Sequence, residues 1–350
     1  MWAIRNMYRS SAQWCNFKQR GPQSTLQLKI QEYGSDTDSS CISQDLQPLS
    51  TYGVSQYQYA WLIMDMVAAV NGEGDKMSYD KASMAPQGGR HHEMEAKMKH
   101  INLSFAACGF LGIYHLGAAS ALCRHGKKLL KVVKAFAGAS AGSLVATVLL
   151  TVPENIEECT KITYEFAEDT RKLYLGALTP GFDLMAKLRG CIDSILPPNA
   201  HEIAENRLFV SVTSAKNGKN HLLSNFASRE DLVKVLLASS FIPLYAGINA
   251  VDYKGQKWID GGLTDGLPIL PVGRTVTVSP FSGRLDICPQ DRGRMDVYAK
   301  VAKQDLKLST ANFVRLHQAL FPPGQEKMES LYQEGYDDAI HFLLKENWFE

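Results

Sequence analysis

The run VVKAFAGASAGSLVATVLLTV occupies residues 132–152 and decides the fold class. Its first part, residues 132–140, is a short apolar stretch that is typical of a buried strand. Its second part, residues 141–152, is an apolar helical stretch that Pro153 ends, because proline cannot continue a helix. Small residues join the two parts. The run therefore predicts one unit of strand, sharp turn and helix.

The same unit occurs upstream. Residues 101–109, INLSFAACG, predict a buried strand, and residues 110–126 predict a helix that ends at Gly126. Strands that alternate with helices favour an α/β layered fold. The other predicted elements are an amphipathic helix over 153–174, a hairpin over 207–226 turning at Asn217-Gly218, a helix over 228–243 capped by Ser228, a hairpin over 249–262 turning at Lys254-Gly255, a strand over 274–281, and helices from about 293 with a break at Pro322-Pro323.

The composition excludes several classes of protein. The 350 residues include 37 Lys and Arg against 36 Asp and Glu, and the net charge of +1 excludes a strongly basic nucleic-acid binder. Apolar residues make up 45% and charged residues 21%, which is the balance of a globular chain and not of a disordered one. We therefore expect no nucleic-acid partner.

Cysteine and histidine form no metal or disulfide pattern. The seven cysteines are odd in number, widely spaced and without a CxxC pair, which gives neither a disulfide framework nor a zinc site. His91 and His92 are the one close histidine pair, and no ligand motif accompanies them. We expect reduced thiols in an intracellular protein, with no metal and no organic cofactor. The cysteines are Cys15, Cys41, Cys108, Cys123, Cys159, Cys191 and Cys288.

The first 97 residues differ from the rest of the chain. They contain polar runs without a persistent helix or strand period, so we expect a disordered or targeting extension. Their apolar run, residues 60–70, is too short to span a bilayer. Residues 1–31 carry five basic residues and precede the first acidic residue, Glu32, which is typical of a mitochondrial presequence. An upstream extension without a targeting role is the alternative.

The first candidate for chemistry is Gly138-Ala139-Ser140-Ala141-Gly142. A sharp turn from strand to helix projects a serine hydroxyl, and small neighbours allow that strained turn to form. The helix that follows directs its N-terminus at the hydroxyl, where free N–H groups favour negative charge. The alternative is a turn of small residues that serves only to pack the helix closely and has no catalytic role. The position between an apolar strand and an apolar helix favours a nucleophile.

A second glycine-containing turn covers residues 107–112, ACGFLG. Such loops bring backbone N–H groups close to an anion. A dinucleotide-binding fingerprint would need a first glycine where Ala107 stands and an acidic residue about 20 residues further on. No acidic residue occurs from 101 to 153, which argues against a dinucleotide. An oxyanion hole needs only two oriented amides, and it remains compatible with this loop.

The third candidate is Asp260-Gly261-Gly262, at the end of the predicted strand QKWID. A carboxylate at a strand end, followed by two glycines, can approach another loop closely. On its own this stretch is more typical of an ordinary turn. Its meaning therefore depends on the other two stretches.

Together the three stretches resemble the patatin-like phospholipase family. The order is a strand, a glycine loop and a helix, then GASAG, then DGG 120 residues after the serine, over about residues 98–350. The resemblance implies an α/β fold with three α/β/α layers, a central mostly parallel sheet and a helical C-terminal part. It divides the chain into the extension 1–97, a catalytic domain over 98–273, and a C-terminal strand and helices over 274–350 that complete the domain.

The resemblance also implies a catalytic dyad, with Ser140 as nucleophile and Asp260 as general base. Plant patatins have a glycine at the position of Ala107 and a basic residue at that of Leu111, so this chain departs from them and the choice of amide donors stays open. The implied oxyanion loop is Cys108, Gly109 and Phe110, and the implied motif glycines are Gly138, Gly142, Gly261 and Gly262.

The activity implied by the resemblance is that of a serine lipid acyl hydrolase. An acyl-serine intermediate can be captured by water, which gives hydrolysis, or by an alcohol, which gives transacylation. The implied substrates are triacylglycerol, phospholipid and retinyl ester, and the implied partner is a lipid-droplet or membrane surface. We expect a cytoplasmic enzyme at such surfaces, with a mitochondrial share directed by residues 1–31.

Other interpretations stay open from the sequence. An α/β-hydrolase would add His317 or His341 to form a Ser-Asp-His triad. Residues 101–123 and 135–153 are long and uncharged enough to cross a bilayer, apart from one histidine, which would give a non-enzymatic protein with two spans. Cys108 could be read as a thiol nucleophile, although a small buried cysteine is the usual case. In an interaction protein the serine and aspartate would be structural.

Overall fold

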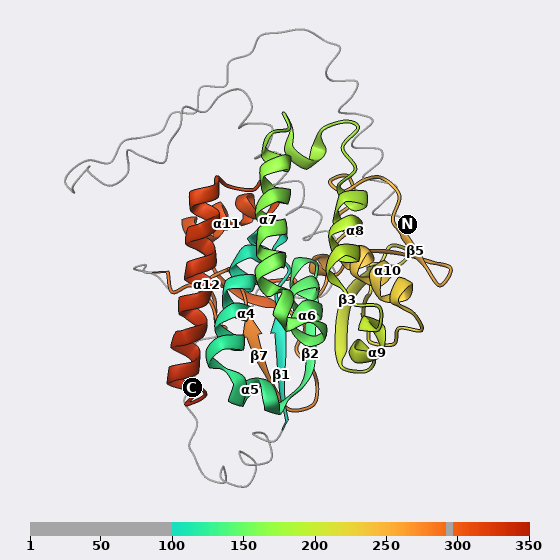
Figure 1. Ribbon diagram of the computed structural model, residues 1–350. Helices are drawn as coiled ribbons and strands as arrows, with labels where there is room; N and C mark the ends of the chain where they lie inside the picture. Colours follow the sequence, from blue (N-terminus) through green and yellow to red (C-terminus); the bar gives the residue numbers. More distant parts are fainter. Residues whose placement is uncertain (1–99, 292–296) are drawn as a thin grey trace, which may run out of the picture. The chain divides into compact units, whose positions relative to one another are not determined.

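Strands and helices alternate along the described part of the chain, as the sequence predicts. The computed structural model describes residues 100–291 and 297–350, so the extension predicted over 1–97 lies outside it. The elements, drawn in Figure 1, are β1 (Ile101–Phe105), η1 (Gly109–Leu111), α4 (Gly112–His125), α5 (Lys127–Val132), β2 (Val133–Ala139), α6 (Ala141–Thr151), η2 (Pro153–Asn155), α7 (Ile156–Arg171), η3 (Gly176–Leu178), α8 (Leu184–Ile195), α9 (Ala200–Ala204), β3 (Leu208–Ser214), β4 (Asn220–Leu223), α10 (Arg229–Ser239), β5 (Val251–Tyr253), β6 (Gln256–Asp260), η4 (Gly261–Leu263), β7 (Arg274–Val278), β8 (Tyr298–Val301), β9 (Gln304–Lys307), α11 (Thr310–Leu320) and α12 (Gln325–Lys345).

The central sheet has the strand order β5-β6-β3-β2-β1-β7, and β4 pairs with β3 beside this path. Strands β3, β2, β1 and β7 are parallel, and the hairpin β5–β6 joins β3 in the antiparallel sense. All of β1 is buried, as expected for a central parallel strand that is covered on both faces. The parallel strands place the turns after β1 and β2 at the same edge of the sheet.

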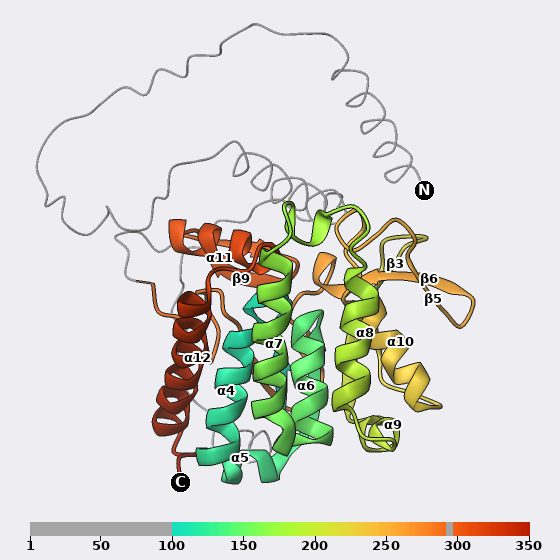
Figure 2. The same cartoon turned by 45° about the horizontal axis from the view of Figure 1, so that its top comes forward.

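The helices pack on the strands of the sheet and against one another. Helix α6 lies on β1, β2 and β3, and α10 lies on β3, β5 and β6. Helix α4 is buried against α12, and α4, α6, α7, α8 and α12 stand side by side in both views (Figures 1 and 2). On the opposite sheet face, Leu270 packs on Ala135 and Ala137. The predicted α/β fold, with a mostly parallel central sheet and flanking helices, is confirmed.

The structure corrects the helix predicted from about residue 293 onward. Among the described residues, β8 and β9 form an antiparallel hairpin before α11 begins. Its turn places Ala302 and Lys303 at φ 45° and 67°. Alanine and lysine favour helix locally, but Leu306 pairs with Gly283, so a tertiary contact ties this segment into an extended conformation. The sequence pattern carries no signal of that long-range pairing.

Two smaller differences concern element ends. The strand predicted over 101–109 ends at Phe105, because the chain leaves the sheet to form the loop before η1. Helices α5, α8 and α9 were not predicted. Helix α8 is amphipathic and is capped by Asp183, whose carboxylate accepts a hydrogen bond from the Ala186 N–H (2.9 Å).

The alternative with two membrane spans is wrong for the described residues. Residues 101–123 divide into β1, η1 and most of α4, and residues 135–153 divide into most of β2 and α6. Each stretch is apolar because it is buried between the sheet and the helices. None of the helices between residues 100 and 350 that the structure describes is both long and apolar enough to cross a membrane.

Candidate active site

Ser140 stands at the turn between β2 and α6. Its backbone has φ 52° and ψ −131°, a conformation that residues other than glycine rarely adopt. The Ser140 N–H donates to the Ser239 hydroxyl (2.8 Å), which in turn donates to the Ser211 carbonyl of β3 (2.7 Å). These two bonds hold the turn against the sheet. The serine therefore lies at the N-terminus of α6, where unpaired helix N–H groups stabilise negative charge.

The glycines on both sides of Ser140 let helix and strands approach closely. A Cβ on Gly142 would lie 2.2 Å from the carbonyl oxygen of Phe105, at the end of β1. A Cβ on Gly138 would lie 2.6 Å from the backbone carbonyl carbon of Gly142. Side chains at either position would push α6 away from the sheet. The spacing of the GASAG motif thus has a steric cause in this fold.

Asp260 is the last residue of β6 and is only 3% exposed. The Gly262 N–H donates to its Oδ1 (2.6 Å), and a Cβ on Gly261 would lie 2.0 Å from the Ser211 carbonyl oxygen. Burial raises the pKa of the Asp260 carboxyl to about 7, although hydrogen bonding with Ser140 and with the Gly262 N–H lowers it in part. Near neutral pH this carboxylate can accept a proton, which an exposed aspartate does poorly.

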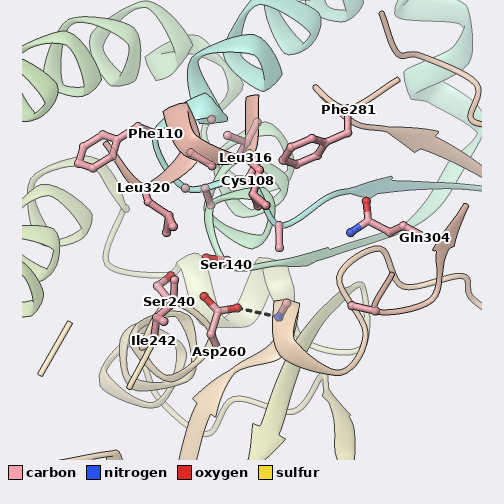
Figure 3. Close-up of a pocket in the computed structure, with 18 of the residues that line it drawn as sticks. Cys108, Phe110, Ser140, Ser240, Ile242, Asp260, Phe281, Gln304, Leu316 and Leu320 are labelled. Carbon is pink, nitrogen blue, oxygen red and sulfur yellow. Dashed lines mark hydrogen bonds between the residues drawn. The ribbon is translucent and has the colours of Figure 1, made fainter. Parts of the chain in front are cut away.

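Strand β3 brings Ser140 and Asp260 together across 120 residues of sequence. Its neighbouring residues Ser211 and Val212 pair with Ala139 of β2 on one side and with Asp260 of β6 on the other. Ser140 follows Ala139 directly, so both side chains emerge beside the same point of β3. Figure 3 shows them facing each other in one pocket. Ser140 and Asp260 therefore lie close together because of the register of the sheet, and not because of their spacing in the sequence.

The loop Cys108-Gly109-Phe110 lies at the end of β1, next to the serine turn. Within the described residues, its three backbone N–H groups have no acceptor. Gly109 has φ 52°, and a Cβ there would lie 2.1 Å from the Ala319 carbonyl oxygen of α11. The loop is thus held in one shape with free donors, which is what an oxyanion hole requires.

The structure also explains the alanine that stands where plant patatins have glycine. A Cβ on Gly262 would lie 2.6 Å from the Cβ of Ala107, so the turn after Asp260 contacts the loop that follows β1. The Ala107 N–H donates to the Gly266 carbonyl (2.8 Å). The methyl group of Ala107 fits because Gly262 leaves room for it. The three stretches singled out in the sequence therefore meet at one place.

Ser140 and Asp260 both line a cavity of about 2040 Å³. This volume exceeds the roughly 300–1,000 Å³ of most small-molecule pockets, and it suits a lipid with long chains. The apolar side of the lining comes from α6, α7 and α8, and the polar side comes from β8, β9 and the start of α11. The apolar side includes Leu144, Val148, Ile162, Phe166, Leu188 and Ile192, and the polar side includes Tyr298, Lys300, Lys303, Gln304, Lys307 and Asn312.

The two histidines of the triad alternative lie outside the described cavity lining. His317 stacks on Phe321 (ring centroids 5.2 Å apart), and burial lowers the pKa of its imidazole. His341 is exposed on α12. The thiol alternative also lacks support, because burial first and the nearby Asp260 second raise the pKa of Cys108 well above its ordinary value. A thiol in that state is a weak nucleophile.

Sequence reasoning missed two polar residues, one that binds the serine turn and one that lines the cavity. The Ser239 hydroxyl accepts a hydrogen bond from the Ser140 N–H, and its only signal in the sequence was a pair of serines directly after the apolar run 235–238. Gln304 lies on β9, in the segment that was expected to be helical. Neither residue belongs to a motif, so each becomes visible only when the chain is folded.

Comparison with known proteins finds relatives of one family. A sequence model described as "Patatin-like phospholipase" matches residues 103–272. "Patatin-like phospholipase domain-containing protein 4" from Homo sapiens is 74% identical over 253 residues, which cover 72% of this chain and 100% of that protein. "Patatin-like phospholipase domain-containing protein 2" from Mus musculus is 40% identical over 70% of this chain and 50% of that one.

A further relative carries the name of a transferase. "1-acylglycerol-3-phosphate O-acyltransferase PNPLA3" from Homo sapiens is 35% identical over 243 residues, 69% of this chain and 50% of that protein. The chain thus spans the full length of the first relative and about half of the other two. Identity of this level over a complete relative establishes kinship. The chain belongs to the patatin-like phospholipase family.

Proposed function

We propose that the chain is a serine lipid acyl hydrolase in which Ser140 is the nucleophile and Asp260 the general base. The observation that carries the proposal is the pair itself: a strained serine facing a buried carboxyl, within a cavity that has one apolar side. A carboxyl with a pKa of about 7 is matched to proton transfer near neutral pH. No imidazole is needed.

The mechanism follows from these positions. The Ser140 hydroxyl attacks the ester carbonyl, and its proton passes to Asp260 as the new C–O bond forms. The negative charge on the former carbonyl oxygen is stabilised by the free N–H groups of Cys108, Gly109 and Phe110, together with the N-terminus of α6. Collapse of this intermediate expels the alcohol, which takes the proton back from Asp260, and leaves an acyl-serine.

The acyl-serine is resolved by a second attack. Water gives a free fatty acid, and an alcohol gives a new ester, with Asp260 acting as base again in either case. We propose triacylglycerol, phospholipid and retinyl ester as substrates, and transacylation as a second outcome of the same intermediate. The name of the acyltransferase relative supports the transfer reaction.

Active-site labelling tests the proposal. A fluorophosphonate probe is expected to label the wild-type protein and to leave Ser140→Ala unlabelled. Ser194→Ala is the matched control, because Ser194 is an exposed serine at the end of α8. Hydrolysis of triolein, a phosphatidylcholine and retinyl palmitate would then rank the substrates. Labelling of Ser140→Ala at the wild-type rate would refute the assignment of the nucleophile.

We also propose that the cavity is presented to a lipid-droplet or membrane surface. The loop over residues 240–250 contributes Ile242 and Tyr245 to the cavity lining, and it exposes Leu244 (40%) and Ile248 (71%) to solvent. Exposed apolar residues beside a cavity are typical of a surface that contacts lipid. In sedimentation with phosphatidylcholine vesicles, Leu244→Ser with Ile248→Ser should weaken binding at least about fivefold. Ile269→Ser, another exposed apolar residue, should leave binding unchanged.

The mitochondrial share of the protein remains a proposal that rests on residues 1–31, which lie outside the described residues. Their basic and acid-poor composition supports it. A fusion of residues 1–31 to a fluorescent reporter tests it directly. A reporter that stays diffuse in the cytosol would contradict the targeting role without affecting the enzyme assignment.

A further inference from the structure

The cavity has two chemically different sides, with the proposed dyad between them. In Figure 3, Phe110 and Leu320 lie on one side of Ser140 and Asp260, and Gln304 lies on the other. Apolar side chains from α6, α7 and α8 line the first side, which suits a fatty acyl chain. Strands β8 and β9 line the second side. By exclusion, the second side receives the alcohol part of the ester.

Gln304 is the unusual residue on the alcohol side. It is 6% exposed, and Figure 3 shows its carboxamide directed from β9 toward the dyad. Within the part of the chain that the structure describes, its buried Oε1 has no hydrogen-bond partner. No other described residue that lines the cavity has a buried side-chain oxygen or nitrogen without a partner. Because buried polar groups are nearly always paired, this amide is suited to a ligand.

We propose that the Gln304 carboxamide binds a free hydroxyl group on the alcohol part of the substrate, so that the cavity prefers partial acylglycerols such as diacylglycerol. This inference rests on the proposed function of the dyad. A hydroxyl group both donates and accepts a hydrogen bond, so it pairs with either end of a carboxamide. An ester carbonyl only accepts, and it would leave the Gln304 oxygen without a partner. A fully esterified glycerol therefore fits this position less well.

The charges near Gln304 also favour a neutral group. The Lys303 ammonium donates to Asp265 Oδ2 (2.7 Å), and the Lys307 ammonium donates to the Asp291 carbonyl (2.9 Å). Two of the three lysines on this hairpin are thus already held by oxygen atoms of the protein. A phosphate would have to compete for them, and its ionised oxygens have no proton to donate to the Gln304 oxygen. A neutral hydroxyl requires no such rearrangement.

A matched pair of substrates tests the proposal. The two substrates are 1,2-dioleoylglycerol and its 3-O-methyl ether, which differ only in the free hydroxyl group. Both are presented in the same detergent micelles. We expect the wild-type protein to hydrolyse diacylglycerol with kcat/KM about tenfold higher than the ether. Gln304→Met, which keeps the length and removes the amide, should bring this ratio close to one. The measured quantity is the ratio of kcat/KM for the two substrates, so a loss of activity that affects both substrates equally does not change it.

Controls separate the outcomes. Gln256→Met changes an exposed glutamine on β6, outside the cavity lining, and should keep the wild-type ratio. The proposal is overturned if the wild-type protein hydrolyses the two substrates with equal kcat/KM, or if Gln304→Met keeps the wild-type ratio of kcat/KM. If Gln304→Met does not fold, Gln304→Leu is measured instead. If Gln304→Met loses activity only on dioleoyl phosphatidate, the proposal is overturned, because Gln304 would then bind a phosphate. Hydrolysis that persists in Ser140→Ala would instead refute the dyad.

Discussion

Two turns of this molecule have the same backbone angle and different residues. Gly109, after β1, and Ser140, after β2, both have φ 52°, and both introduce a helix at the same edge of the sheet. At Gly109 a side chain would collide with the Ala319 carbonyl, so glycine is the residue that fits. At Ser140 the side chain has the cavity in front of it. The strain of a non-glycine residue there, about 1–3 kcal/mol, is retained at the position of the proposed nucleophile.

The comparison indicates a division of labour. The glycine turn offers backbone N–H groups and no side chain, whereas the serine turn offers a side chain and a backbone N–H already bound to Ser239. In the proposed mechanism, oxyanion stabilisation and nucleophilic attack therefore come from neighbouring turns of the same sheet. The predictions below test this division, in order of decreasing expected effect.

The largest effect is expected at the serine turn. Ser140→Ala and Asp260→Asn should each lower ester hydrolysis at least about 10³-fold, because each removes one half of the proton transfer. The double variant should be no worse than either single variant, since residues that act as one unit do not contribute additively. Steady-state hydrolysis with circular dichroism as a folding control would measure this. Additive losses would contradict the dyad.

The next effect is expected at the glycine turn. Gly109→Ala places a Cβ 2.1 Å from the Ala319 carbonyl oxygen and strains a backbone with φ 52°. The loop must shift, so its N–H groups no longer point toward the oxyanion, and kcat should fall about 10²–10³-fold. Gly255→Ala is a control for strain alone, because Gly255 also has a positive φ but open space around it. Equal losses in the two variants would contradict an oxyanion role for the loop.

An intermediate effect is expected from pH. Asp260 must be ionised to accept the serine proton, so activity should rise with pH through about 7, the pKa of its carboxyl. With that pKa, about half of the carboxyl is ionised at pH 7 and about 1% at pH 5, so kcat/KM should fall roughly 50-fold between them. A rate profile between pH 5 and 9 measures this. A midpoint near 4 would show that burial does not control the base.

A smaller effect concerns stability and compares the two turns directly. Ser140→Gly relieves the strained backbone, whereas Ser140→Ala keeps a Cβ at φ 52°. The glycine variant should therefore have a free energy of unfolding about 1 kcal/mol higher than the alanine variant, despite the entropy that glycine adds to the unfolded chain. Urea unfolding of the two inactive variants measures the difference. An alanine variant that is the more stable one would show that the turn is not strained.

The smallest effect is expected at histidine. Neither turn uses an imidazole, so His317→Ala and His341→Ala should keep activity within about threefold of the wild type. Esterase assays of the two folded variants test this expectation. A loss of about 10³-fold in either would favour a triad.

The sequence alone determined the local features. The two strand–turn–helix units, the glycines that flank Ser140 and the glycines after Asp260 were readable because each depends on residues that are close together in the chain. The hairpin turns at Gly218 and Gly255 followed from the same short-range rules, and both glycines have the positive φ that such turns need. The family resemblance added roles for these residues.

Only the tertiary structure decided the rest. Ser140 meets Asp260 because both flank β3 in a particular register, and the Asp260 carboxyl has a raised pKa because distant segments exclude water from it. The hairpin that carries Gln304 replaced an expected helix, since its pairing with the segment around Gly283 outweighs the helix propensity of its alanines and lysines. Registers, burial and long-range pairing depend on residues far apart in the chain, so no local pattern encodes them.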